Sequence, residues 1–377
     1  MKRRVVVLFG GRSAEHEISC ISARSVIDAL DPERYEVVPV GISKRGTWHL
    51  LSGPPALDAG SGTLPAVVPT DGDDVALAQE PGASALVDAG GVPTEIDVVF
   101  PVLHGPYGED GATQGMLELA GVPYVGAGVL ASAIGMDKAV QKVVFEAAGL
   151  PIVAWEPVRE AEWAEDPDAI RARAQSLGYP LFSKPATLGS SVGVRKVNDP
   201  PELRSALEEA FRYARKAVLE RSVEGAREIE CSVLGNDDPV ASVAGEIVPI
   251  GHEFYDYAAK YLDAEGARLT IPAEVPAETL EEVQRVAVAA FRAIDAAGMA
   301  RVDFFLTVDG TLLLNEINTI PGFTSISMYP KLWEASGLSY PELIDRLIEL
   351  AIERHDLERK KGTAAGELGD AGRGTRG

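Results

Sequence analysis

The chain opens with apolar runs separated by turn residues, a pattern that predicts a parallel α/β sheet. Val5–Phe9 is continuously apolar and ends in Gly10-Gly11, which is typical of a buried strand entering a loop. Further strands are expected at Tyr35–Ile42 and Asp97–Leu103, with a helix at Ser19–Leu30 before the first of them. A strand–helix–strand order favours a Rossmann-like sheet covered by helices.

The pattern becomes irregular after the second strand. Residues 52–95 are rich in Gly, Pro, Ala and Asp, which predicts irregular structure or an insertion. Val122–Gly128 predicts one more short strand, which closes an N-terminal α/β domain that we place at residues 1–130. A helix, strands and a glycine-rich loop then predict a small lobe at residues 131–221.

The last part of the chain predicts a larger α+β lobe at residues 222–357. Within it, Ser339-Tyr-Pro-Glu342 resembles a capping box that opens a final amphipathic helix. Residues 358–377 have no apolar periodicity, and we expect a disordered tail there.

The segment Ala300–Gly322 predicts a β-hairpin in the larger lobe. Asp309-Gly310 is a strong signal for a two-residue hairpin turn, and such a turn fixes the register of the flanking strands. In that register Asp303 lies directly opposite Glu316. Two opposed carboxylates repel each other unless a cation lies between them.

The same register predicts a metal site. Arg301 pairs with Asn318 on the face that carries Asp303 and Glu316, because side chains two residues apart share a face. Carboxylate and amide oxygens suit Mg²⁺ or Mn²⁺, which commonly bridge protein oxygens to substrate phosphates. The alternative is a solvated strand face with an Arg–Asp ion pair, but the strands are otherwise too apolar to be exposed.

Composition narrows the class of partner. The chain has 377 residues and a formal net charge of −22, which argues against nucleic acid as the main partner. Its two cysteines, Cys20 and Cys231, have no metal-ligand spacing. The apolar run after MKRR is too short for a signal peptide or a membrane span, so we expect a cytoplasmic protein.

A glycine-rich loop offers donors for phosphate. Lys184 ends a predicted strand and is followed by a loop that contains Ser190 and Ser191 and ends at Gly193. Backbone N–H groups of such a loop can cover phosphates while the ammonium neutralises them. A surface turn with a solvated lysine is the alternative. Lys138, at the start of a helix, is a second candidate contact.

Two loops at strand ends are candidate substrate contacts. Glu15, after the first strand, could hold a substrate ammonium that His16 orients, although a helix-capping role is the alternative. His104 begins a glycine-dense loop after the strand at Asp97–Leu103. Phe254–Tyr261, dense in aromatic residues, could be a lid or a packed loop.

One glycine motif points to a different class of protein. Gly126-Ala-Gly128-Val-Leu-Ala131 matches the GxGxxG/A pattern of dinucleotide-binding folds, with Glu146 about twenty residues further on. That fingerprint normally opens a domain, whereas here it closes one. We therefore favour a tight interdomain turn.

Taken in order, these motifs resemble the D-alanine–D-alanine ligases of the ATP-grasp superfamily. The likeness extends to about residue 355, and the segments that carry it are LFGGRSAEHEIS, FPVLHGPYGEDGATQG, MDKAVQK, KPATLGSSVGV, EFYDYAAKY, RVDFF and NEINTIPGFTSIS. The resemblance implies an N-terminal α/β domain followed by two lobes that clasp ATP. It also implies a homodimer.

The resemblance implies a role for each candidate residue. Asp303, Glu316 and Asn318 would hold two Mg²⁺ or Mn²⁺ ions. The implied ATP contacts are Lys138, Lys184, Ser190, Ser191, Glu220 and Glu228. The implied substrate contacts are Glu15, His104, Ser327 and Met328. The catalytic set implied by the family is Glu15, Ser190, Lys260, Tyr261, Arg301 and Gly322, with Arg301 and the Gly322 N–H at the oxyanion.

The implied reaction joins two D-alanine molecules through an acyl phosphate, with release of ADP and phosphate, for cell-wall precursor synthesis. Thr187, Ser183 and Arg221-Ser222 depart from the family pattern, and all lie around the nucleotide.

Three alternatives stay open from the sequence. The first is a related ligase that joins D-alanine to D-lactate or D-serine, or another ATP-grasp carboxylate–amine ligase, although the pair Lys260-Tyr261 resembles the lid of dipeptide-forming enzymes. A nicotinamide oxidoreductase would rest on Gly126-Ala-Gly128 alone. A non-catalytic ATP-binding module is disfavoured because both metal carboxylates and Arg301 are present.

Overall fold

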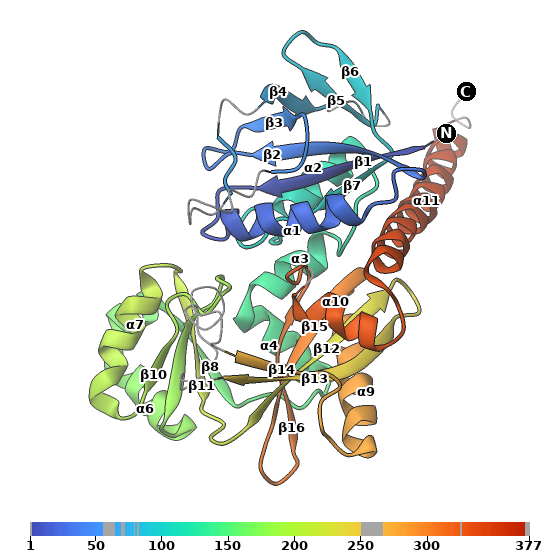
Figure 1. The fold of residues 1–377 in the computed structure, drawn as a ribbon. Helices are drawn as coiled ribbons and strands as arrows, with labels where there is room; N and C mark the ends of the chain where they lie inside the picture. The colour runs from blue at the N-terminus through green and yellow to red at the C-terminus, as the bar shows by residue number, and fades with distance from the viewer. Residues whose placement is uncertain are drawn as a thin grey trace.

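The computed structural model describes residues 2–55, 65–68, 72–78, 80, 83–249, 267–324 and 326–373, and these residues form three sheets with flanking helices. The N-terminal sheet lies at one end of the molecule, and the other two lie at the opposite end (Figure 1). The described part of the chain has no helix that combines the length and the apolar character needed to cross a membrane.

The N-terminal sheet has a parallel centre. Among the described residues its strand order is β6-β5-β4-β3-β2-β1-β7. The strands are β1 (Arg3–Gly10), β2 (Tyr35–Ile42), β3 (Trp48–Leu51), β4 (Gly72–Leu77), β5 (Ala85–Asp88), β6 (Pro93–Glu95) and β7 (Val98–Pro101). β1 pairs in parallel with β2 and β7, and α1 (His16–Ala29) connects β1 to β2. The predicted parallel α/β core is therefore confirmed.

Two predictions for this region differ from the structure. The segment 52–95 contains β4, β5 and β6, which extend the sheet by antiparallel pairing. These strands have three to six residues each, too few for their alternation to stand out among the glycines and prolines around them. Val122–Gly128 makes only a bridge between Tyr124 and Val99, because the backbone turns at Gly126 with φ of 97°.

The second sheet is antiparallel and belongs to the small lobe. Helices α2 (Ala112–Ala120), α3 (Val129–Met136) and α4 (Lys138–Ala147) precede it. Its described strands, in spatial order, are β10 (Arg195–Val197), β9 (Leu181–Pro185), β11 (Lys216–Arg221) and β8 (Trp155–Arg159). The accompanying helices are α5 (Glu160–Glu165), α6 (Pro167–Leu177), the 3₁₀ turn η1 (Pro200–Glu202) and α7 (Leu203–Phe211).

The third sheet carries the predicted hairpin. Its described strands, in spatial order, are β14 (Ala267–Thr270), β13 (Val240–Pro249), β12 (Arg227–Gly235), β15 (Gly298–Leu306) and β16 (Leu312–Asn318). The amphipathic helix α9 (Ala277–Ala293) packs on this sheet through Val283, Val286, Ala287, Ala290 and Phe291, a spacing of three and four residues.

The hairpin register differs from the prediction near the turn and agrees with it at the site. Thr307 N donates to Thr311 O at 3.0 Å, so the loop has three residues instead of two. Phe304 pairs with Leu314, whereas Asp303 pairs with Glu316, which leaves Asn315 as an extra residue in β16. This β-bulge offsets the longer loop and restores the predicted pairing.

The C-terminal helix α11 (Tyr340–Arg373) joins the N-terminal sheet to the large lobe (Figure 1). Its residues Leu343, Ile344, Leu347 and Ile348 lie in one core cluster with β1, β7 and α10 (Met328–Ala335). Glu342 accepts from Ser339 N at 3.0 Å, as the predicted capping box requires. The helix continues to Arg373 where we expected a tail, since residues 353–367 are mostly good helix formers.

Candidate active site

The β15–β16 hairpin brings the predicted metal residues to one face. Arg301 contacts both carboxylate oxygens of Asp303 at 2.7 Å, through Nε and Nη2. Asn318 Nδ2 donates to Asp303 Oδ2 at 3.1 Å. The carboxylate of Glu230, on the neighbouring strand β12, lies 3.0 Å from Arg301 Nε. The Asp303 carboxylate is thus held by a cation and an amide on its own sheet face.

The donor set of this hairpin suits a hard divalent cation. Asp303 and Glu316 supply carboxylate oxygens from facing strands, and Asn318 supplies an amide oxygen. Among the described residues no three His, Cys, Asp or Glu side chains come together as a metal-ligating group. A cation here would therefore have only two protein carboxylates and would need further oxygens from a ligand or water.

Two lysines project from one face of α4. Lys138 and Lys142 are four residues apart, so they lie one above the other on the helix. Lys138 Nζ lies 3.2 Å from Glu316 Oε2 and donates to Leu188 O at 2.9 Å. Burial acts to lower the pKa of Lys138, but the carboxylates of Glu316, Glu220 and Glu109 together outweigh burial and raise the pKa. Lys138 is therefore a partly buried cation between the hairpin and the glycine-rich loop.

Lys142 and Lys184 both contact the carboxylate of Glu220. Lys142 Nζ lies 3.2 Å from Glu220 Oε1, and Lys184 Nζ donates to Oε2 at 2.6 Å. Burial acts to raise the pKa of Glu220, but the two lysines hold it below its usual value. Asn315, the bulge residue, accepts from Lys142 through its carbonyl at 3.3 Å and from Lys184 through Oδ1 at 3.4 Å.

The glycine-rich loop of the small lobe contacts the N-terminal domain. Ser190 and Ser191 have positive φ angles of 51° and 57°, a backbone conformation that residues other than glycine rarely adopt. The Ser190 hydroxyl donates to the carboxylate of Glu15. A Cβ added at Gly105 would lie 2.9 Å from Glu15 Oε2, so the loop after β7 also approaches this carboxylate closely.

The loop after β7 contributes a neutral histidine and a partly buried acid. Nδ1 of His104 lies 3.3 Å from Ile320 O, and Nε2 lies 3.4 Å from the Ser22 hydroxyl. Burial lowers the pKa of His104. Glu109 accepts from Gly105 N at 2.7 Å, and burial followed by the nearby Glu15 raises the pKa of Glu109 to about 8. A protonated Glu109 avoids two adjacent charges at neutral pH.

Gly322 and Ser327 flank a turn before α10. Ser327 Oγ accepts from Thr324 N at 3.1 Å and precedes Met328, the first residue of the helix. A Cβ at Gly322 would lie 3.1 Å from Ser327 Oγ. The Met328 side chain packs with Ile247, so only its backbone remains for a polar ligand.

Four further predicted residues have different outcomes. Lys260 and Tyr261 lie outside the described residues. Glu228 lies on β12 opposite Phe305 of β15. His16, expected to orient a ligand, instead uses Nδ1 on Gly11 O at 2.7 Å and Nε2 on Val67 N at 3.0 Å. It therefore holds two backbone segments together.

The comparisons with known proteins decide the family. Residues 4–127 match the family model described as D-ala D-ala ligase N-terminus, and residues 144–349 match D-ala D-ala ligase C-terminus. The chain belongs to the D-alanine–D-alanine ligase family. The D-alanine–D-alanine ligase of Pseudarthrobacter chlorophenolicus is 50% identical over 364 residues, which cover 94% of this chain and 95% of the relative. The D-alanine–D-alanine ligase of Thermoanaerobacter sp. is 52% identical over 357 residues, which cover 94% of this chain and 98% of the relative.

Solved ligases share the architecture. The D-alanine–D-alanine ligase of Coxiella burnetii superposes with a TM-score of 0.84 at 38% identity and covers 98% of this chain and 99% of its own. The VanG D-Ala:D-Ser ligase of Enterococcus faecalis superposes with a TM-score of 0.81 at 33% identity. The match covers 93% of this chain and 100% of the VanG chain. The predicted fold class, an α/β domain followed by a two-lobed ATP-grasp fold, is confirmed.

Three residues of the candidate site are absent from the residues predicted from sequence. Glu109 lies inside the glycine-dense motif after His104, but a second carboxylate near Glu15 needs the folded geometry to be recognised. Lys142 follows Lys138 at helical spacing, and this was a usable signal. Asn315 precedes Glu316 and would point away from it in a regular strand, so only the bulge reveals its contacts.

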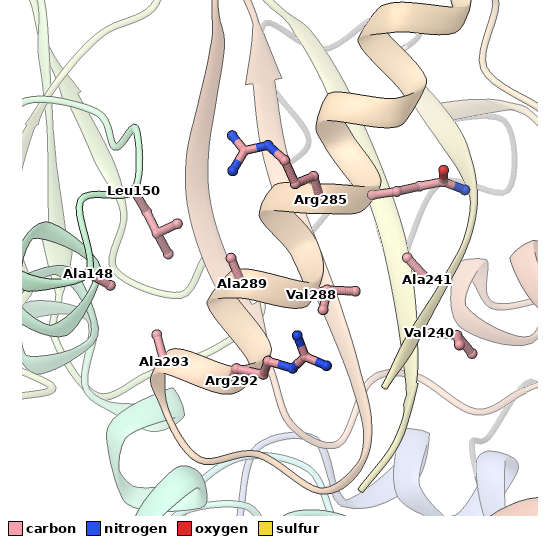
Figure 2. A pocket seen from close by; sticks show the side chains of 10 residues that line it. Ala148, Leu150, Val240, Ala241, Arg285, Val288, Ala289, Arg292 and Ala293 are labelled. Carbon is pink, nitrogen blue, oxygen red and sulfur yellow. The ribbon is translucent and has the colours of Figure 1, made fainter. Parts of the chain in front are cut away.

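A separate hollow of about 790 Å³ lies along α9, beside the start of β13 and the loop after α4 (Figure 2). Its lining is mostly alanine and valine, and its two arginines pair elsewhere, Arg285 with Glu282 and Arg292 with Asp238. The residues that line it include none of the predicted ligase site, so this hollow is separate from that site.

Proposed function

We propose that this ligase joins two molecules of D-alanine into D-alanyl-D-alanine, uses one ATP, and thereby supplies a precursor of peptidoglycan. The observation that carries the proposal is the extent of the likeness. About half of the residues are identical to enzymes of that name over nearly the whole chain. The fold brings the predicted site residues of both lobes and of the N-terminal domain to one region, which supports the same reaction.

The first step makes D-alanyl phosphate. A carboxylate oxygen of the first D-alanine attacks the γ-phosphorus of ATP, the bond from that phosphorus to the β–γ bridging oxygen breaks, and ADP leaves. Lys138 and Lys184, with Ser190 and Ser191 of the loop, would contact the phosphates, since positioning and electrostatics dominate phosphoryl transfer. Glu220 and Glu228 would lie at the adenine and ribose side.

The second step forms the peptide bond. The amine of the second D-alanine attacks the carbonyl carbon of D-alanyl phosphate, and the tetrahedral intermediate expels inorganic phosphate as the attacking nitrogen loses its proton. Arg301 and the Gly322 N–H would stabilise the oxyanion.

Four residues would hold the two amino acids. Glu15 would bind the ammonium of the first D-alanine, and its contact with Ser190 supports a shared position. His104, neutral through burial, would lie beside that substrate. Ser327 and the backbone of Met328 would receive the carboxylate of the second D-alanine. Lys260 and Tyr261, outside the described residues, remain predicted parts of a lid that excludes water.

Two Mg²⁺ or Mn²⁺ ions fit the donor chemistry of the hairpin. Asp303, Glu316 and Asn318 would hold them, and the bound ions would neutralise the charge of the transferring phosphoryl group. This face already attracts cations, because Lys138 forms an ion pair with Glu316 and Arg301 forms one with Asp303.

Phosphate release is the decisive experiment. We expect release from ATP and magnesium only when D-alanine is present, with the dipeptide detected by mass spectrometry. L-alanine, D-lactate and D-serine are assayed beside it. Preferential use of D-serine or D-lactate as second substrate would replace the dipeptide assignment, an alternative that the likeness to the VanG ligase keeps open. No release with any of them would overturn the proposed reaction.

We also propose that the enzyme works in the cytoplasm as a homodimer, with domains at residues 1–130, 131–221 and 222–357. Light scattering coupled to gel filtration tests the dimer. A monomer at working concentration would contradict it.

A further inference from the structure

Lys184, the proposed phosphate contact, shares its carboxylate partner with a second lysine. Glu220 has 3% of its side chain exposed, and Lys142 has 1%. Lys142 Nζ lies 3.2 Å from Glu220 Oε1, and Lys184 Nζ lies 2.6 Å from Oε2. Each oxygen of one buried carboxylate therefore has its own ammonium group.

The two lysines differ in how they are held. Lys142 also donates to the backbone carbonyl of Asn315 at 3.3 Å, a position fixed by the bulge in β16. Lys184 instead contacts the Asn315 side chain at 3.4 Å, and 13% of its own side chain is exposed. Lys184 is thus the lysine that can turn toward a ligand, while Lys142 is enclosed.

Removing the only cation from a buried carboxylate is strongly unfavourable, because the charge is left without solvent or a partner. If Lys184 turned to ATP and Glu220 had no other cation, that cost would oppose ATP binding. With Lys142 in place, Glu220 keeps one ammonium at 3.2 Å whichever way Lys184 points.

We propose that Lys142 is a positioning residue that remains the counter-ion of Glu220 while Lys184 moves to the phosphates of ATP. The inference rests on the proposed function of Lys184. It assigns Lys142 to nucleotide binding and to neither amino-acid site.

The first test is Lys142→Met, which keeps the length of the side chain and removes its charge. We expect the KM for ATP and the Kd for ADP, measured calorimetrically, to rise about tenfold or more, because Lys184 is then retained by Glu220. The KM for D-alanine should change less than about twofold. Lys44→Met, at an exposed ion pair with Glu17, is the matched control and should leave all these constants unchanged.

The second test is a double-mutant cycle with Glu220→Gln, which separates this role from a structural one. Once Glu220 is uncharged, Lys142→Met should alter the Kd for ADP by less than about twofold. An equal loss in both backgrounds, or no loss in the single variant, would overturn the proposal. If Lys142→Met alone does not fold, the Kd for ADP of Glu220→Gln is compared with that of the double variant. A difference of more than about twofold would then overturn the proposal.

ADP binding also separates the two proposals. If the wild-type enzyme failed to release phosphate with D-alanine, the proposed reaction would fall, and the binding cycle would still test Lys142.

Discussion

At the scale of single residues, the candidate site consists of partly or fully buried charges that lie beside opposite charges. Glu316 lies beside Lys138, Asp303 lies against Arg301, and Glu220 has two lysines. Buried ion pairs contribute little net stability, because desolvation offsets their attraction. Their presence at these positions is therefore better explained by chemistry than by folding.

We predict that Glu316→Gln lowers kcat by more than about 100-fold while the protein stays folded, because the change removes one charge from the proposed cation site and keeps the shape of the side chain. Steady-state kinetics and a thermal melt measure the two effects. Glu282→Gln, at an exposed pair with Arg285 on α9, is the control. Near-normal turnover of Glu316→Gln would defeat the metal assignment.

At the scale of elements, the bulge in β16 is the feature that the sequence could not reveal. Asp309-Gly310 predicts a hairpin, and the hairpin exists, but the loop is one residue longer than the motif implies. The predicted pairing of Asp303 with Glu316 is confirmed because Asn315 offsets that difference. Local propensity identifies a turn, whereas loop length and bulges depend on the packing of the whole sheet.

Deleting Asn315 should therefore keep Asp303 opposite Glu316 and remove only the contacts to Lys142 and Lys184. We expect the KM for ATP to rise about tenfold, with a smaller change in kcat, since the proposed cation site retains its register. Asn315→Ala, which keeps the carbonyl and loses Oδ1, should have a milder effect. A larger fall in kcat than rise in KM would indicate that the hairpin register has shifted.

The elements recognised from the sequence are those with long, unambiguous patterns. The strands β1 and β2 and the helix α1 were predictable from the apolar pattern, and the start of α11 from its capping box. The short strands β4–β6 were not, since three to six residues among glycines and prolines carry little signal. Likewise, motif order predicted most residues of the candidate site, whose roles stay predictions, but Glu109 and Asn315 gain their neighbours only through tertiary contacts.

At the scale of the molecule, a single apolar cluster links the two ends of the chain. Val5, Val7 and Phe9 of β1 lie in the same cluster as Leu347 and Ile348 of α11. Arg354 of α11 adds hydrogen bonds to Gly126 O and Tyr124 O, the segment where the N-terminal domain ends. The glycine motif at 126–128 therefore serves a packed turn, as the sequence favoured, and offers no support for a dinucleotide site.

Leu347→Ala should lower the free energy of unfolding by about 2–5 kcal/mol, the usual cost of such a cavity in a core. Because the cluster is shared, we expect the N-terminal domain and the large lobe to lose stability together. Denaturant unfolding, followed by tryptophan fluorescence and circular dichroism, should show one transition at a lower denaturant concentration than in the wild type. A chain that ends at residue 361 keeps the cluster and should unfold like the full chain. Two separated transitions in Leu347→Ala would show that the two parts fold independently.

The position of α11 has a consequence for synthesis on the ribosome. The first strand, β1, emerges at the start of translation, yet the helix that completes its core begins at Tyr340. Domains generally fold as they emerge, N-terminal parts first. Here the earliest sheet must keep part of its apolar face uncovered until almost the whole chain has been made, so the nascent protein needs protection at its beginning for as long as its end is missing.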